Sequence, residues 1–110
     1  MKHKHYAPNT PCILVYDEDE DIQIEKINNI ISQNVCVLGF DEHKDRINAD
    51  KFISLGAMNN LEEISKNIFT GLRQADEQNA VLIVIEGVKK ERIGIAIMNR
   101  LIKACEHQGE

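Results

Sequence analysis

The sequence predicts an α/β fold, a small three-layer, Rossmann-like open parallel sheet of four to five strands. Short apolar runs alternate along the chain with segments in which apolar residues recur every three or four positions. This order of strands and helices is typical of α/β proteins. The apolar runs are continuous, as expected for strands that are buried on both faces of a parallel sheet. A chain of 110 residues suits a single domain.

The first predicted strand is the apolar run at residues 12–16, which is rich in strand formers. The acidic string at residues 17–21 ends this run. Carboxylates suit the start of a helix because they accept hydrogen bonds from free N–H groups and favour the helix dipole. Ile24, Ile27 and Ile31 then recur at helical spacing, so an amphipathic helix is predicted after the string.

The second strand is predicted at residues 35–40, the next continuous apolar run. The polar stretch at residues 41–50 that follows leaves room for about one helical turn. A weaker third strand is predicted at residues 52–55, and Gly56 ends it.

A second helix is predicted to begin at Asn60, because an asparagine side chain caps helix N-termini well. Glu62 and Glu63 stand in its first turn, where negative charge is favourable. Gly71 is a mild defect in the helix. The apolar stripe is formed by Leu61, Ile64, Ile68, Phe69 and Leu72.

The most apolar strand is predicted at residues 80–85 and is expected to lie in the interior of the sheet. Residues 86–90 are predicted to be a loop, and a third helix is expected over residues 91–107. Lys103 lies near the C-terminal end of that helix, where a cation is favourable. Its apolar stripe contains Gly94, Ile97, Met98, Leu101 and Cys105.

The formal net charge of −5 argues against direct binding of nucleic acid, because an acidic surface repels phosphate groups. No apolar run reaches the roughly 18 residues that span a bilayer, and the polar N-terminus lacks a signal-peptide core. Three cysteines, Cys12, Cys36 and Cys105, form an odd set without a C-x-x-C pair. We therefore expect a cytoplasmic protein with no membrane partner, whose cysteines are buried, reduced thiols.

The strand and acidic string at residues 12–21 are similar to the start of a phosphorelay receiver domain, which holds a divalent cation there. Such a domain also needs an aspartate after its third strand and a lysine after its last. Here the third strand ends in Ser54, Leu55 and Gly56, and the last clear strand leads into Glu86. We therefore interpret the string as a solvated turn that caps a helix.

Other motifs that could carry chemistry are incomplete. Gly87 and Gly94 do not form G-x-G-x-x-G and do not follow the first strand, as a dinucleotide site requires. His3 and His5 are too few ligands for a metal site. We predict no catalytic residue, metal or cofactor within this domain. The side chains considered and set aside are Ser32, Ser54 and Ser65, which lack a nucleophile elbow, and His43 and His107, which are expected to be exposed.

Three segments of the chain resemble one family. Residues 1–8, which read Met-Lys-His-Lys-His-Tyr-Ala-Pro, resemble the interdomain linker of the long-form threonylcarbamoyl-AMP synthases, which typically ends in H-Y-A-P. Residues 93–104 are similar to that family's closing helix, usually G-L-G-x-A-I-M-N-R-L followed by Lys-Ala-Ala. Residues 60–77 look like its middle helix. The chain thus resembles the Rossmann-like C-terminal domain of this family with part of the linker.

The resemblance implies a lid arm at residues 1–11 and a Rossmann-like accessory domain at residues 12–110. In that family a YrdC-like catalytic domain, a nucleotidyltransferase, makes threonylcarbamoyl-AMP from threonine, bicarbonate and ATP with Mg. The product serves threonylcarbamoyladenosine formation at position 37 of tRNA. This domain is therefore expected to be inactive alone and to have the catalytic domain as its partner, through which it meets ATP and threonine.

The family's linker folds over the mouth of the active site. This implies that Lys2, Lys4, His5 and Tyr6 contact the nucleotide, with cations at the phosphates and a ring beside the nucleotide. His3 stands where the family usually has Tyr, so its contact with the lid is not carried over.

Asn99 and Arg100 of the closing-helix motif are expected to serve structure or domain docking. The catalytic domain is absent from this sequence and Met1 coincides with the Met inside the linker motif, so a domain fragment is expected. One alternative of another class stays open, namely a free-standing α/β module that binds a small ligand or nucleotide.

Overall fold

The structure, a computed structural model, describes residues 8–106. Its four strands form one parallel sheet in the order β1-β4-β2-β3. No helix of this described part is long and apolar enough to cross a membrane. The strands are β1 (Cys12–Val15), β2 (Val35–Phe40), β3 (Lys51–Gly56) and β4 (Leu82–Glu86). The helices are α1 (Glu20–Ile30), the 3-10 helix η1 (Asp41–Arg46), α2 (Leu61–Asp76) and α3 (Ile93–Glu106).

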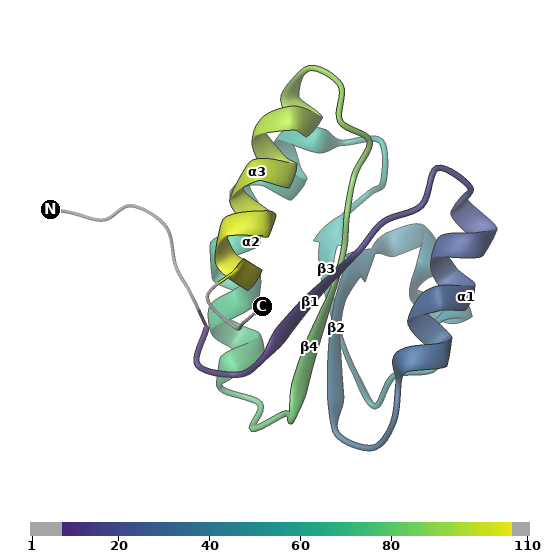
Figure 1. The fold of residues 1–110 in the computed structure, drawn as a ribbon, viewed down its shortest axis with the longest axis vertical. Coiled ribbons are helices and arrows are strands. Elements are labelled where there is room, and N and C mark those ends of the chain that lie inside the picture. Colours follow the sequence, from purple (N-terminus) through teal and green to yellow (C-terminus); the bar gives the residue numbers. More distant parts are fainter. Residues whose placement is uncertain (1–7, 107–110) are drawn as a thin grey trace, which may run out of the picture.

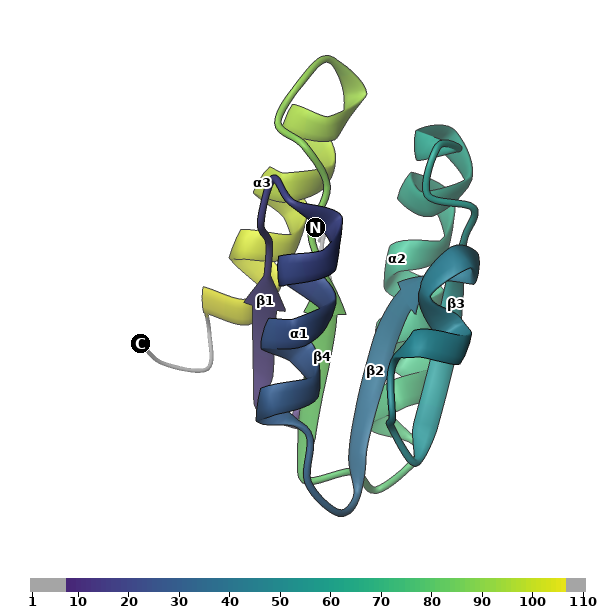
Figure 2. The ribbon, with the colours of Figure 1, turned by 90° about the vertical axis from the view of Figure 1, so that its right-hand side faces the viewer.

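The sheet is the middle of three layers, with α1 and η1 on one face and α2 and α3 on the other (Figures 1 and 2). The chain passes from β1 over β4 to β2 through α1, and it returns from β3 over β2 to β4 through α2. Right-handed crossovers that run in opposite directions along a sheet lie on opposite faces. The predicted α/β fold with a parallel sheet and helices on both faces is confirmed, with four strands.

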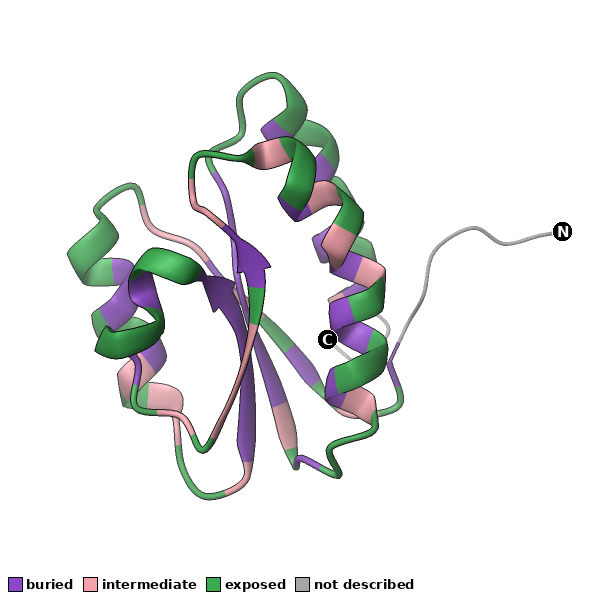
Figure 3. Ribbon diagram, turned by 180° about the vertical axis from the view of Figure 1, so that it is seen from behind, coloured by how far each residue is buried: buried purple, intermediate pink, exposed green. Residues whose placement is uncertain are grey.

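Two apolar clusters fill the spaces between the layers. The larger lies between the sheet and the pair α2 and α3, and the smaller lies between the sheet and α1. Figure 3 shows how the buried residues concentrate on the strands and on the helix sides that face them. Ile83 and Ile85 belong to the larger cluster and Val84 to the smaller, because successive side chains of a strand point to opposite faces. The prediction that this strand is interior is confirmed.

Both predicted N-terminal helix caps are confirmed. Asp19, in the middle of the acidic string, caps α1 by accepting hydrogen bonds from the N–H groups of Asp21 and Ile22, at 2.9 and 3.3 Å. Asn60 caps α2 by accepting from the N–H of Glu63 at 3.1 Å. Each cap satisfies N–H groups that have no partner inside the helix.

Two expectations at the carboxyl edge of the sheet were wrong. Glu86, which the sequence placed in a loop, is the last residue of β4 and is fully buried. His43, which was expected to be exposed, has only 1% of its surface accessible. It belongs to η1, whose six polar residues form about two turns, too short a segment to show from the sequence which side faces the protein.

Candidate functional site

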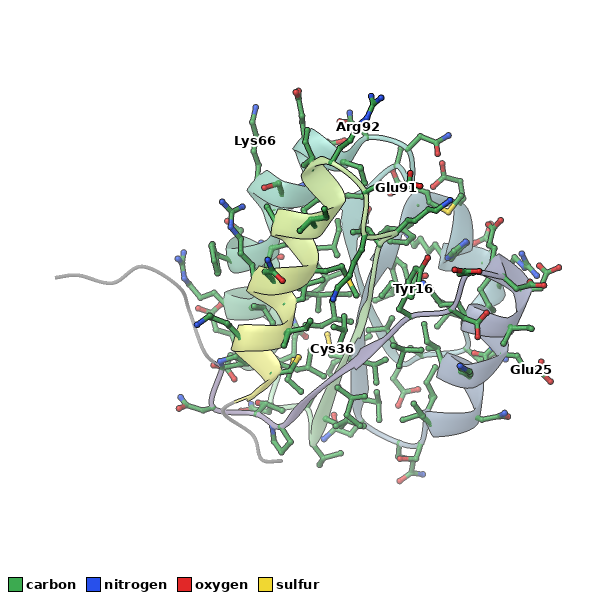
Figure 4. The ribbon with its side chains drawn as sticks, turned by 45° about the horizontal axis from the view of Figure 1, so that its top comes forward. Tyr16, Glu25, Cys36, Lys66, Glu91 and Arg92 are labelled. Atoms are coloured by element: carbon green, nitrogen blue, oxygen red, sulfur yellow. The ribbon has the colours of Figure 1, made fainter. Side chains whose placement is uncertain are left out.

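A cavity of about 430 Å³ lies at the carboxyl edge of the sheet, where the loops after all four strands meet. The neighbouring strands β1 and β4 send their connections to opposite faces of the sheet, which opens a crevice between them. Ligands of open α/β sheets bind at such points. Figure 4 turns this end of the molecule toward the viewer, with Tyr16, Glu91 and Arg92 labelled around it. The apolar part of the wall includes Phe40, Met58, Leu61 and Val88.

A hydrogen-bonded network centred on Glu86 lies below this cavity. Oε1 of Glu86 accepts from Nε2 of Gln23 at 2.8 Å and lies 2.7 Å from Nδ1 of His43. Oε2 of Glu86 accepts from the N–H of Phe40 at 3.2 Å. On its other side, His43 places Nε2 at 2.6 Å from Oε2 of Glu20. Gln23, His43 and Glu20 line the cavity, so the network forms part of its wall.

Each ring nitrogen of His43 faces a carboxyl oxygen, and this limits how the protons of the network can be arranged. A neutral imidazole donates one hydrogen bond, so its second nitrogen would turn a lone pair toward an ionised carboxylate. The geometry therefore calls for an imidazolium between Glu20 and Glu86, or for one carboxyl that keeps its proton. Glu86 is fully buried, whereas 45% of the Glu20 side chain is exposed. Solvent therefore reaches the protons of this network from the Glu20 side.

Sequence reasoning missed this network, although one signal was available. Glu86 directly follows the most apolar run of the chain. An acidic residue at the carboxyl end of an interior strand must be paired, because an isolated buried carboxylate is costly. No sequence pattern identifies Gln23 and His43 as the partners, since both lie on other elements.

The acidic string is used for capping and ion pairs. Oδ1 of Asp17 accepts from the N–H of Asp19 at 2.9 Å, and Oδ2 lies 3.0 Å from Nζ of Lys26. The N–H of Asp19 and then Lys26 hold the pKa of Asp17 below its usual value. Arg46 binds Asp21 at 2.8 Å. Within residues 8–106 no three His, Cys, Asp or Glu side chains are grouped as metal ligands.

Gly87 and Gly94 allow the chain to pack closely after β4. A Cβ atom on Gly94 would lie 2.0 Å from the carbonyl oxygen of Lys89, and one on Gly87 would lie 3.0 Å from Cβ of Tyr16. Both positions are thus explained by packing between α3, the preceding loop and Tyr16, the residue after β1. Arg92 between them has a φ of 54°, which is uncommon for a residue with a long side chain.

Residues 1–7 of the predicted lid arm lie outside the described residues, whereas its base at residues 8–11 is described. The N–H groups of Asn9 and Thr10 each donate to the carboxylate of Asp76 at 3.0 Å, and the Thr10 hydroxyl donates to it at 2.9 Å. Asp76 is the last residue of α2, so Asn9 and Thr10 lie beside the C-terminal end of that helix. The residues outside the described part are Lys2, His3, Lys4, His5 and Tyr6, together with His107.

Asn99 and Arg100 are both exposed on α3. Arg100 donates from Nη1 to Oγ of Ser65 at 2.7 Å, so it links α3 to α2. Asn99 lies between Ile95 and Ile102 in the sequence at helical spacing, and these isoleucines are 47% and 38% exposed. This side of α3 therefore presents apolar surface to the solvent.

The chain is similar to known proteins over nearly its whole length. Residues 1–105 match the family described as threonylcarbamoyl-AMP synthase, C-terminal domain. The threonylcarbamoyl-AMP synthase of Pyrococcus abyssi is 34% identical over 114 residues, which are 98% of this chain and 32% of that protein. The enzyme of the same name from Bacillus subtilis is 34% identical over 107 residues, or 96% of this chain and 31% of that protein. The chain thus spans about a third of the length of these relatives.

Solved structures agree with the sequence match. The crystal structure of P. abyssi Sua5 complexed with L-threonine has a TM-score of 0.79 at 33% identity, over 98% of this chain and 32% of that one. A P. abyssi Sua5 variant in which a neighbouring His and Tyr are replaced by alanines has a TM-score of 0.77 at 32% identity, over 92% and 29%. The C-terminal Sua5 domain from Pyrococcus horikoshii has a TM-score of 0.67 at 34% identity, over 86% and 92%.

Proposed function

Because the chain belongs to the family of threonylcarbamoyl-AMP synthase C-terminal domains, we propose that it is the accessory domain of such an enzyme. In this proposal it regulates a YrdC-like catalytic domain of the same protein, a cytoplasmic nucleotidyltransferase that makes threonylcarbamoyl-AMP from threonine, bicarbonate and ATP with Mg. The product is used for tRNA modification. The domain itself contributes no catalytic group and no cofactor, and its acidic charge keeps it from binding tRNA directly.

One observation carries the proposal: the family match runs through the arm and the folded domain without a break, over residues 1–105. The hydrogen bonds of Asn9 and Thr10 to Asp76 give the arm a fixed point of departure. Seven extended residues reach at most about 25 Å from that point. The arm is therefore long enough to extend over a neighbouring domain while its base stays attached.

The chemistry of the arm suits a lid over a nucleotide. Lys2 and Lys4 would face phosphate oxygens, and His5 and Tyr6 would contact the nucleotide. His5 and Tyr6 form the only His-Tyr pair of the chain, and a neighbouring His and Tyr are the residues replaced in the P. abyssi variant. A closed lid of this kind excludes water from the reacting groups.

The exposed side of α3 is proposed as the docking face for the catalytic domain. Ile95 and Ile102 supply apolar area, and Asn99 between them supplies a hydrogen-bonding group. Arg100, whose guanidinium binds Ser65, would act by holding α3 against α2 so that the face keeps its shape.

The test is a reconstitution that measures pyrophosphate release from ATP with threonine and bicarbonate. The chain alone is expected to give no product above a control without enzyme, because no residue set for adenylation is present. The same chain joined to its YrdC-like domain is expected to raise turnover above that of the catalytic domain alone. Equal turnover with and without this chain would refute the accessory role.

The cavity at the carboxyl edge favours a second candidate, a free-standing module that binds a small ligand or nucleotide. The genomic DNA immediately upstream discriminates between the two. An in-frame YrdC-like reading frame that ends in Ser-Pro-Gly supports the accessory domain, and an unrelated neighbour with a stop codon before Met1 supports the free-standing module.

A further inference from the structure

The sulfur atoms of Cys12 and Cys105 lie 2.7 Å apart, although the two residues are separated by 93 positions and are not joined by a disulfide. Cys12 is the first residue of β1 and Cys105 lies in the last turn of α3. Two unbonded sulfurs do not usually pack so closely, and the gap exceeds the length of a disulfide bond by only about 0.7 Å. The fold therefore holds these two side chains in position for a bond between them.

The two thiols differ in a way that assigns them separate roles. Cys12 is buried, whereas Cys105 is partly exposed. The hydrogen bond between the two sulfurs lowers the pKa of Cys105, and the same interaction raises the pKa of Cys12. A thiolate is the attacking form in thiol–disulfide exchange, so the accessible Cys105 is the attacking residue and Cys12 is the resolving one.

We propose that Cys12 and Cys105 form a thiol–disulfide exchange site that accepts small-molecule disulfides. The Cys105 thiolate attacks one sulfur of the small disulfide, its S–S bond breaks, and one thiolate leaves. Cys12 then loses its proton and attacks the sulfur of Cys105, which releases the second small thiolate. The protein gives up two electrons and two protons and gains one disulfide, and the small disulfide is reduced to two thiols.

The resulting bond would fasten the end of α3 to the start of β1. Cys12 stands three residues after Asn9, where the arm is attached to Asp76, and Pro11 between them accepts a hydrogen bond from the N–H of Ile83 at 2.8 Å. A link at Cys12 therefore restrains the base of the arm. An effect of this restraint on the turnover of the enzyme depends on the proposed function, whereas formation of the bond does not.

The experiment incubates the purified chain with oxidised glutathione at about pH 8 and measures the intact mass and the linked peptides. The expected result is a loss of about 2 Da and a linked peptide that joins Cys12 to Cys105. The Tm is expected to rise by at least roughly 5 °C, because the bond closes a long loop. The chain used contains no catalytic domain, so a failure here leaves the accessory role untouched.

Three variants make the result specific. Cys12→Ser is expected to stop at a glutathione adduct on Cys105, and Cys105→Ser is expected to form neither adduct nor bond. Cys36→Ala is the matched control and is expected to behave like the parent, because Cys36 is buried and lies outside the pair. Absence of the Cys12–Cys105 peptide from the parent chain in excess oxidised glutathione, or an equal yield of peptides linked through Cys36, overturns the proposal.

Discussion

Oε1 of Glu86 lies 2.7 Å from Nδ1 of His43, and both side chains are at most 1% exposed. Replacing Glu86 by Gln keeps the shape but turns one of its two oxygens into an amide NH2 group, although Oε1 faces Gln23 and His43 and Oε2 accepts from the N–H of Phe40. We expect Glu86→Gln to lower the free energy of unfolding in urea by about 3 kcal/mol, since it breaks a buried charged network. Glu20→Gln is the control, because that side chain is 45% exposed, and its cost should stay below about 1 kcal/mol. Equal losses would show that the burial of Glu86 does not make its contribution larger than that of the exposed Glu20.

Ile83 in the centre of β4 is fully buried, so a charge there has no water and no partner. We expect Ile83→Asp to cost at least about 4 kcal/mol and to leave much of the chain unfolded at 25 °C. Val81, two residues earlier and 59% exposed, provides the matched control. Val81→Asp should retain the far-ultraviolet circular dichroism and the melting curve of the parent, and similar melting of both variants would contradict the assigned core.

The strands, the helix caps and the central place of β4 could be predicted from the sequence, because each depends on residues that are neighbours in the chain. The run at residues 80–85 and the caps at Asp19 and Asn60 are of this kind. Burial of His43 could not be predicted in this way. It depends on Glu20 and Glu86, which approach only after α1, η1 and β4 have packed together.

The cysteines show the same limit. All three were expected to be buried, and this was confirmed for Cys12 and Cys36, whereas Cys105 is only partly covered. The contact between Cys12 and Cys105 spans 93 positions and depends on α3 lying across the edge strand β1. Helical spacing can place Cys105 on the inner side of α3, but it does not indicate the residue that it meets there.

Gly94 provides a test of close packing at the start of α3. The Cβ atom of an alanine there would meet the carbonyl oxygen of Lys89, a backbone atom that cannot move without shifting the loop. We expect Gly94→Ala to lower the free energy of unfolding by about 2 kcal/mol, measured in urea, despite the better helix propensity of alanine. Ala96→Ser, on the exposed side of the same helix, should change it by less than about 0.5 kcal/mol. A more stable Gly94→Ala variant would show that the loop adapts freely.

Burial raises the pKa of the Cys36 thiol from its ordinary value of 9.0 to about 11, and Lys51 opposes this only in part. The thiol is therefore protonated at about pH 8, and iodoacetamide should label Cys105 and leave Cys36 unmodified in the folded chain. Because the folded state holds this proton more tightly, the stability that Cys36 contributes is complete below pH 9.0 and declines as the pH rises from 9.0 to about 11. Labelling of Cys36 as fast as in urea would contradict its burial.

The proposed lid should depend on both the side chains of the arm and its attachment. In the full-length enzyme we expect Lys4→Ala and Tyr6→Ala each to lower synthase turnover roughly tenfold, because a lid acts through contacts made when it is closed. Asp76→Ala should lower turnover too, since it removes the carboxylate that holds Asn9 and Thr10. Cys105→Ala under reducing conditions is the control and should act only through stability.

The triple variant Lys2→Ala, Lys4→Ala and Tyr6→Ala gives the outcome that would contradict the lid. If it leaves turnover and ATP affinity at parental values, the arm only connects the two domains. The family membership would stand in that case, because it rests on the match over residues 1–105 and not on the arm's contacts.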